Sequence, residues 1–341
     1  MNLVSPGKDT ARLTSGVPGL LDVPWLAAER LLRHIYWSWP TLRRWRKRRE
    51  RRRRPALQAC AREDLRECLR AIGVIEGALV LLHTRITGVH FHGGGSFLEA
   101  NGWSASEILL SEVMDLLGPA GTLAMPTNAK YQTDALEERH SGCEIAVYDP
   151  ARTPCAVGLI NDFFWRSKGV RRSLFPFNML AACGPLADEL LRDNLNERKP
   201  SPHGVDSGYY RICRHNGLVV SVGVPLRECL TLAHVVEEVR ADWPIRDFFT
   251  ERRYQVVQGG IAREWTVRVL REEYEKFCHC RKKMGRDLVA EGVIHEGSVG
   301  TVRVDWARAA EIYEFFWRKT MERPYPYYGL WMMRKPWRKA G

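Results

Sequence analysis

The sequence predicts an α/β protein, because short apolar runs typical of buried strands alternate with segments of helical periodicity. Residues 78–82 (Ala-Leu-Val-Leu-Leu) and 217–225 (Gly-Leu-Val-Val-Ser-Val-Gly-Val-Pro) are predicted strands, the second bounded by glycine and proline. Residues 61–73 carry apolar side chains at 65, 69 and 72 and end at a glycine, which predicts an amphipathic helix. Residues 104–118 predict another helix, with a serine three residues before a glutamate as a capping box.

The chain of 341 residues is 45% hydrophobic, so it can bury a substantial core as one large domain or two small ones. Its formal net charge is +12. Residues 43–54 hold ten basic residues and one acidic residue, and they therefore supply +9 of that total. The rest of the chain is nearly balanced in charge.

A basic, disordered or amphipathic N-terminal extension is predicted for residues 1–56. Residues 1–20 are expected to be a disordered leader, and residues 20–39 mix Trp, Leu and Ile with arginine at helical spacing. Such a segment can lie on an anionic membrane surface, or it can dock on a protein or serve as a linker. Both alternatives stay open for residues 20–54. Nucleic acid is not expected as a partner, because no nucleic-acid-binding motif accompanies the charge.

The sequence contains no uninterrupted apolar run of the roughly 20 residues that span a bilayer, and its start lacks the apolar core of a signal peptide. Nine scattered cysteines, an odd number, do not form a disulfide framework. We therefore expect a cytoplasmic protein, with peripheral association at the inner membrane face as the alternative that the extension suggests. Cys278-His279-Cys280 is the one local cluster, and without a second ligand pair it predicts no metal site.

The strongest candidate for a functional segment follows the strand at 217–225. We expect one helix over residues 226–238, on which Thr231, His234, Glu237 and Glu238 recur at spacings of three and four residues. A hydroxyl, an imidazole and a carboxylate would then share a surface at the end of a buried strand, where α/β proteins tend to bind their ligands. A packing role for His234 is the structural alternative.

Residues 231–237 resemble the Thr-Ser-Leu-His-Leu-Ala-Glu signature of the aminoglycoside 3-N-acetyltransferase (antibiotic N-acetyltransferase) family, with Thr231, His234 and Glu237 on its Thr, His and Glu. Residues 121–127 (Gly-Thr-Leu-Ala-Met-Pro-Thr) and 201–204 (Ser-Pro-His-Gly) resemble two further family motifs. The resemblance implies a divergent member with one large domain over residues 57–341, built on a central mixed sheet flanked by helices.

This resemblance implies an acyltransferase that moves an acetyl group from acetyl-coenzyme A to a primary amine of an aminoglycoside or amino sugar. It implies His234 as the general base, Glu237 as the residue that orients its ring, and Thr231 as a hydrogen-bond partner of the thioester oxygen. Attack is expected to be direct, because no serine nucleophile elbow and no Cys/His catalytic pattern occurs in the sequence.

The family pattern also implies residues that bind the two substrates. Those expected at the coenzyme A site are His83, Thr84, Arg85, Ser201, His203 and Gly204. Those expected at the amine site are Asp149, Phe175 and Asn178. Phe175 and Asn178 stand where the family has histidines, so part of the cleft wall changes from polar to apolar.

Two alternatives to antibiotic acetylation stay open. The acceptor can be an amino sugar of envelope polysaccharide or natural-product biosynthesis, which the changes at Phe175 and Asn178 and the basic N-terminus favour. The chain can also be a non-catalytic scaffold that keeps the fold and docks through its extension. Affinity for coenzyme A separates the scaffold from the enzymes, because a scaffold has no need of it.

Overall fold

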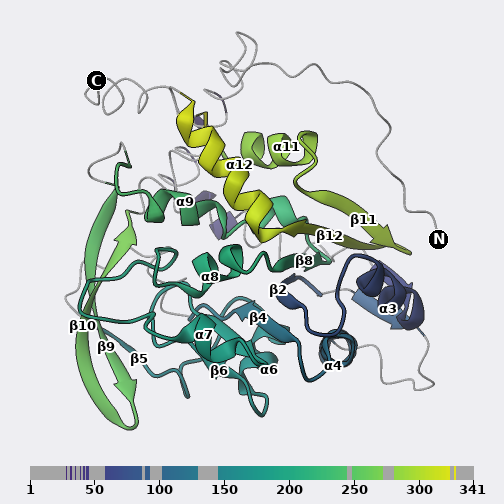
Figure 1. Cartoon of the computed structure of the whole chain (residues 1–341), viewed down its shortest axis with the longest axis horizontal. Helices are drawn as coiled ribbons and strands as arrows, with labels where there is room; N and C mark the ends of the chain where they lie inside the picture. The colour runs from purple at the N-terminus through teal and green to yellow at the C-terminus, as the bar shows by residue number, and fades with distance from the viewer. Residues whose placement is uncertain are drawn as a thin grey trace.

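The structure is a computed structural model. It describes residues 58–86, 89–92, 102–129, 145–243, 248–271, 280–322 and 326–327, together with single positions between 28 and 45. Figure 1 shows a central sheet with helices around it, and a long two-stranded ribbon at one side.

The central sheet has seven strands and is mixed. Its order is β11 (His295–Val299), β12 (Val302–Arg308), β8 (Leu218–Val222), β2 (Leu79–Thr84), β4 (Thr122–Pro126), β7 (Leu180–Cys183) and β6 (Arg171–Arg172). β2 lies in the middle and pairs in parallel with both β8 and β4, whereas every other pairing in this sheet is antiparallel. The carboxyl ends of β8, β2 and β4 therefore meet at one edge of the sheet.

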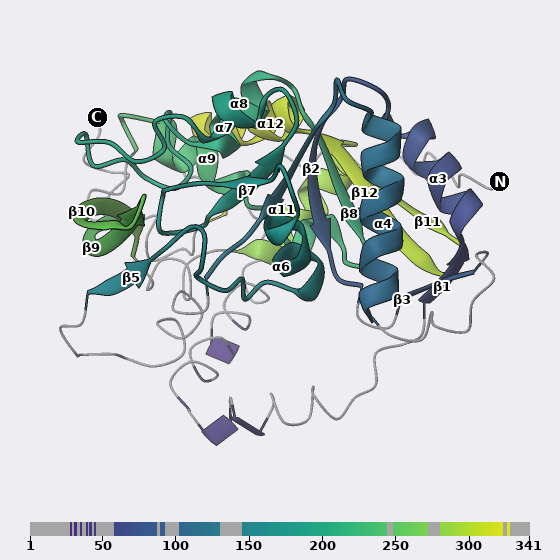
Figure 2. The same ribbon diagram turned by 90° about the horizontal axis from the view of Figure 1, so that it is seen from below.

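Helices cover both faces of this sheet, as expected for strands whose two faces are apolar. One face carries α3 (Arg62–Ala71), α4 (Gly102–Leu117) and α6 (Leu159–Arg166), packed on Val80, Leu82 and Val220. The other face carries α7 (Ala187–Leu191), α8 (Gly208–Arg214), α9 (Ala233–Val239), α11 (Arg281–Ala290) and α12 (Ala309–Met321). Figure 2 shows α3 and α4 side by side over the strands.

Two smaller sheets complete the fold. β9 (Phe249–Gln258) and β10 (Ile261–Leu270) form a long antiparallel hairpin, and β5 (Ala146–Tyr148) adds to β9 in parallel. A third hydrophobic core lies under this hairpin and includes Tyr148, Phe175 and Met179. β1 (Gln58–Ala61) pairs with β3 (Val89–His92).

The predicted fold class is confirmed, since the chain forms a central mixed sheet flanked by helices. The expectation of one helix over residues 226–238 was wrong. A short 3-10 helix, η1 (Leu226–Glu228), is followed by a turn, and α9 begins only at Ala233. The backbone N–H of Leu226 donates to the buried carboxylate of Asp305 at 2.9 Å, which fixes the chain before the turn.

Some predictions fall on residues that the structure does not describe. The leader at 1–20, the boundary at residue 56 and the Cys278-His279 pair lie outside the described residues. The role of residues 20–54 at a membrane or a protein partner stays a prediction. Within the described ranges, none of the helices is both long and apolar enough to cross a membrane.

Candidate active site

The three parallel strand ends open into a cavity of about 570 Å³, here called the strand-end pocket. β2 contributes His83 and Thr84, and the segment after it contributes Arg85. The chain after β4 contributes Asn128, and the start of α6 contributes Asn161. Sheet topology thus gathers side chains that are far apart in sequence at one place, as parallel α/β sheets commonly do for ligands.

Polar groups in the strand-end pocket lack partners within the protein. Among the described residues, Thr84 Oγ1, Asn128 Oδ1 and Asn161 Oδ1 are buried side-chain oxygens without a hydrogen bond. A buried oxygen of this kind costs free energy unless a ligand or water supplies the missing donor. His83 beside them is uncharged near neutral pH, because burial lowers its pKa from 6.5 to about 4. Hydrogen-bond donors of a ligand or of water can satisfy these oxygens.

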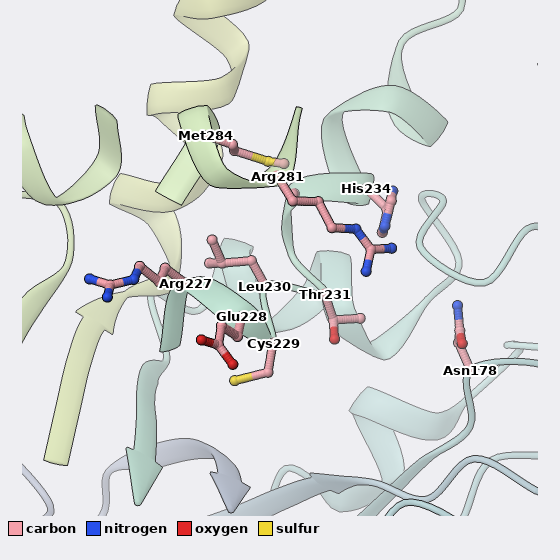
Figure 3. A pocket seen from close by; sticks show the side chains of 10 residues that line it. Asn178, Arg227, Glu228, Cys229, Leu230, Thr231, His234, Arg281 and Met284 are labelled. Carbon is pink, nitrogen blue, oxygen red and sulfur yellow. The ribbon is translucent and has the colours of Figure 1, made fainter. Parts of the chain in front are cut away.

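A second cavity, of about 200 Å³ and here called the His234 pocket, lies beside the first. It is formed by the turn between η1 and α9, by the start of α11 and by Asn178. Figure 3 shows Arg281, His234, Thr231 and Asn178 arranged around it. Cys229 and Thr231 line both cavities, so the two pockets meet at this turn.

His234 and Glu237 form a hydrogen-bonded pair on α9. Nδ1 of His234 lies 2.8 Å from Oε2 of Glu237, one helical turn further on. The Glu237 side chain is 2% exposed and the His234 side chain 16%, so the imidazole reaches the cavity while the carboxylate is buried behind it. A carboxylate only accepts hydrogen bonds, so Nδ1 carries the proton and Nε2 holds the lone pair when the ring is neutral.

A second pair, His203 with Glu238, lies against the first. Oε1 of Glu238 lies 2.7 Å from Nδ1 of His203, and Oε2 accepts the backbone N–H of His203 at the same distance. The two imidazole centroids are 5.3 Å apart. Nε2 of His203 in turn lies 3.3 Å from Nδ2 of Asn178, which lines the His234 pocket. Glu238 thus fixes the tautomer of His203, and His203 accepts the Asn178 amide.

Thr231 owes its position to the break between η1 and α9. It lies in the turn before α9, and not on the helix that carries His234 and Glu237. The turn places its side chain where both pockets meet, as Figure 3 shows for the His234 side. Cys229 lies at the same junction, and burial raises the pKa of its thiol to about 11, so the thiol stays protonated.

The remaining predicted residues do not appear in the described lining of either pocket. Ser201 and Gly204 form the tight turn that carries His203, because Gly204 N–H donates to the Ser201 carbonyl and a Cβ at 204 would come within 2.5 Å of Ser201 Oγ. Phe175 is buried in the third core. Asp149 caps a local turn, with Oδ1 accepting the Ala151 N–H at 2.8 Å.

Several residues of the site were not predicted as ligands. Glu238 shows a signal in the sequence, since it follows Glu237 directly and lies four residues after His234, but its partner His203 is 35 positions away. Asn128, Asn161 and Arg281 show none, because only the folded chain brings them to the pockets. In the ranges that the structure describes, no three His, Cys, Asp or Glu side chains are grouped to hold a metal ion.

Known proteins resemble this chain in both sequence and fold. Residues 81–321 match the family described as aminoglycoside 3-N-acetyltransferase. Aminoglycoside N(3)-acetyltransferase IX of Micromonospora chalcea is 26% identical over 277 residues, which span 74% of this chain and 91% of that enzyme. The crystal structure of aminoglycoside acetyltransferase AAC(3)-Xa is 25% identical with a TM-score of 0.60, over 76% of this chain and 92% of that one.

A more distant structure, a binary complex of AAC-IIIb with CoASH, is 19% identical with a TM-score of 0.59, over 77% of this chain and 97% of that one. At this level of sequence identity, the comparison shows a shared fold alone. The fold, the joined pockets and these matches together define an acyltransferase. The chain belongs to the aminoglycoside 3-N-acetyltransferase family, whose match covers well over half of its length.

Proposed function

We propose that this protein transfers an acetyl group from acetyl-coenzyme A to a primary amine of an aminoglycoside or another amino sugar. The observation that carries the proposal is the His234–Glu237 pair in a pocket that meets the strand-end pocket at Thr231. Acetyl-coenzyme A then occupies the strand-end pocket and the amine occupies the His234 pocket. The acetyl group is transferred where the two pockets meet. The relatives named above are acetyltransferases of aminoglycosides by name.

His234 is the general base in this proposal. An alkylamine is mostly protonated near neutral pH, and it must lose a proton before its nitrogen can attack a carbonyl carbon. Since Nδ1 of His234 donates to Glu237, the lone pair of Nε2 is the one that accepts this proton. Glu237 holds the ring in that tautomer and stabilises the imidazolium that forms.

Acetyl transfer by direct attack balances without an acyl-enzyme. The amine nitrogen forms a bond to the thioester carbon, the C–S bond breaks, and coenzyme A leaves. An ammonium substrate releases two protons overall, of which one reaches the coenzyme A sulfur by way of His234 and the other passes to solvent. Thr231 donates a hydrogen bond to the thioester oxygen as negative charge develops there. The protonated thiol of Cys229 disfavours an acyl-cysteine route.

The strand-end pocket suits the pantetheine arm of coenzyme A. That arm carries two amide groups, whose N–H groups can donate to the buried oxygens of Asn128 and Asn161, and its hydroxyl can bond Thr84. Arg85 is exposed at the rim, where its guanidinium can pair with a phosphate. We propose that Ser201 and Gly204 act indirectly, by holding His203 and through it Asn178.

Acetyl transfer is tested by following the release of coenzyme A thiol with the full-length chain, acetyl-coenzyme A and a panel of amino sugars. We expect His234→Ala to lower kcat by roughly 10²–10⁴-fold, the range for a general base, and to leave the KM for acetyl-coenzyme A unchanged. His295→Ala is the matched control, because this histidine is exposed and stacks on Trp306 away from the pockets. Wild-type kcat/KM at every pH in His234→Ala would refute the assignment of the base.

Calorimetric titration with acetyl-coenzyme A distinguishes the enzyme from a non-catalytic scaffold. Binding in the micromolar range, weakened by Asn161→Leu in the strand-end pocket, is the expected result. Absence of binding up to millimolar concentrations would contradict the proposed function and favour the scaffold.

A further inference from the structure

Charged side chains line the His234 pocket. Of the side chains that line it among the described residues, two are guanidiniums, Arg227 and Arg281, and one is a carboxylate, Glu228. In Figure 3 the Arg281 side chain extends into the pocket toward His234 and Thr231, whereas Arg227 points away from them. A fixed cation thus lies beside the residue proposed to deprotonate the acceptor.

The two arginines differ in their surroundings. Arg227 forms an ion pair with Glu296, and its side chain is packed against Gly285 of α11, where an added Cβ would come within 2.8 Å of it. These contacts hold the Arg227 side chain between η1, α11 and β11. Arg281 is exposed at the pocket and has a guanidinium with five N–H donors, so it can hold a ligand group in addition to a protein contact.

The start of α11 reinforces the positive potential. Its first turn consists of Arg281, Lys282 and Lys283 and contains no acidic residue. The N-terminus of a helix is the positive end of its dipole, so cations there are unfavourable and anions are favourable. Lys283 forms an ion pair with Asp287 at 2.5 Å one turn further on, and Arg281 lines the pocket. An anion bound in the pocket would interact favourably with this end of the helix.

We propose that the acceptor is a primary amine that also carries an anionic group, a phosphate or a carboxylate, which Arg281 binds while the amine faces His234. The proposal rests on the acetyl transfer proposed above and names its substrate class. A guanidinium binds either anion with two parallel hydrogen bonds, which fixes the orientation of the whole molecule. An aminoglycoside carries several ammonium groups, and these would be repelled by the same guanidinium.

The experiment compares matched amines with the full-length protein. The pairs are glucosamine with glucosamine 6-phosphate, ethanolamine with phosphoethanolamine, and propylamine with β-alanine, and kanamycin is the polycationic member. We expect kcat/KM to be at least about tenfold higher for the anionic member of a pair, a factor typical of one charged hydrogen-bonded contact. The phosphate and carboxylate pairs show which anion is preferred.

Arg281→Gln is the decisive variant. We expect it to raise the KM for the anionic acceptor about tenfold or more, to leave the KM for acetyl-coenzyme A unchanged, and to remove the difference between the members of a pair. Arg281→Lys should restore part of the preference, because lysine keeps the positive charge. The preference should stay incomplete, because an ammonium group cannot form the two parallel hydrogen bonds of a guanidinium. Arg286→Gln is the matched control, an exposed arginine on the same helix that does not line the pocket.

Three results would overturn the inference and leave acetyl transfer standing. They are equal or better turnover of the neutral or polycationic amines, a rise only in the KM for acetyl-coenzyme A in Arg281→Gln, and acetyl-coenzyme A binding without turnover of any amine in the panel. The failure of acetyl-coenzyme A to bind at all would instead overturn the proposed function, and the inference with it.

Discussion

His83 shows how one buried residue couples the strand-end pocket to pH. It is the fifth residue of the central strand β2 and is 7% exposed, so its imidazole is desolvated and its pKa falls from 6.5 to about 4. A neutral imidazole offers one donor and one acceptor to a ligand without adding charge. The lowered pKa reduces the free energy of unfolding in acid, because this histidine is protonated more readily in the unfolded chain than in the folded one.

The pH dependence of unfolding tests this state of His83. Between pH 6.5 and about 4 the unfolded protein binds more protons at this position, so the free energy of unfolding falls as pH falls. The contribution of one such group is about 1.4 kcal/mol per pH unit. We expect His83→Gln to flatten the slope by up to that amount, measured by urea unfolding at pH 7 and pH 5. An equal flattening in the exposed control His295→Gln would contradict the explanation.

Asn178 suits its position both in its backbone conformation and in its hydrogen bonding. Its φ is 48°, in the left-handed region that asparagine tolerates better than most residues. Its amide donates to His203, whose other nitrogen is held by Glu238. The amide is neutral at every pH, so Asn178 adds no titrating group to the wall of the His234 pocket.

At the level of elements, the connection from β8 to α9 creates the site. Pro225 directly precedes η1, Asp305 of β12 accepts the N–H of Leu226, and the chain turns before α9 begins. A continuous helix would have kept Thr231 on the same surface as His234, on one side of the junction. The break instead lets Thr231 line both pockets.

Close packing at the end of β7 makes Gly184 a sensitive position. Its φ is 113°, and an added Cβ would collide with the Gly121 carbonyl oxygen and lie 2.8 Å from Thr122 Cα. We expect Gly184→Ala to lower the free energy of unfolding by about 3 kcal/mol or more, since backbone strain and overpacking add. Gly259→Ala in the β9–β10 turn is the control, because its φ is 58° but its Cβ would meet no atom within 4 Å. A cost near 1 kcal/mol is expected there, and equal losses in denaturant titrations would refute the packing argument.

At the scale of the whole molecule, Arg172 connects the central sheet to α6 and to the segment that follows β5. It lies on β6 and is 9% exposed. Its guanidinium donates to the Thr127 hydroxyl at 3.1 Å and to the carbonyls of Thr127 and Thr153. It also lies 4.8 Å from the centre of the Trp165 ring of α6. One side chain thus links β4, α6 and the segment after β5.

Removal of this guanidinium is expected to loosen the whole fold. Arg172→Met removes the donor to the carbonyl of the buried Thr127 and loses the contact with Trp165, for a cost of about 3 kcal/mol. The neighbouring Arg171→Met is the control, because Arg171 pairs with Asp188 on the surface, where an ion pair contributes about 1 kcal/mol or less. Thermal unfolding of both variants gives the comparison. A smaller loss for Arg172→Met than for Arg171→Met would show that the link is not structural.

Much of the fold could be predicted from local patterns. The strands β2 and β8 and the helices α3 and α4 follow from apolar periodicity and glycine stops, which act within a few residues. The helix predicted over residues 226–238 is instead η1 and α9 with a turn between them, and the spacing of side chains along the segment does not indicate that turn.

The sequence by itself determined the fold class, the family and the spacing of His234 and Glu237, because these are set by neighbouring residues and by motifs in order. Only the tertiary structure decided which groups meet there. It paired His203 with Glu238, brought Asn128 and Asn161 to the strand-end pocket, and placed Arg281 beside His234. The physical reason is that the crossover connections of a mixed sheet bring the ends of separate strands together, whatever their distance along the chain.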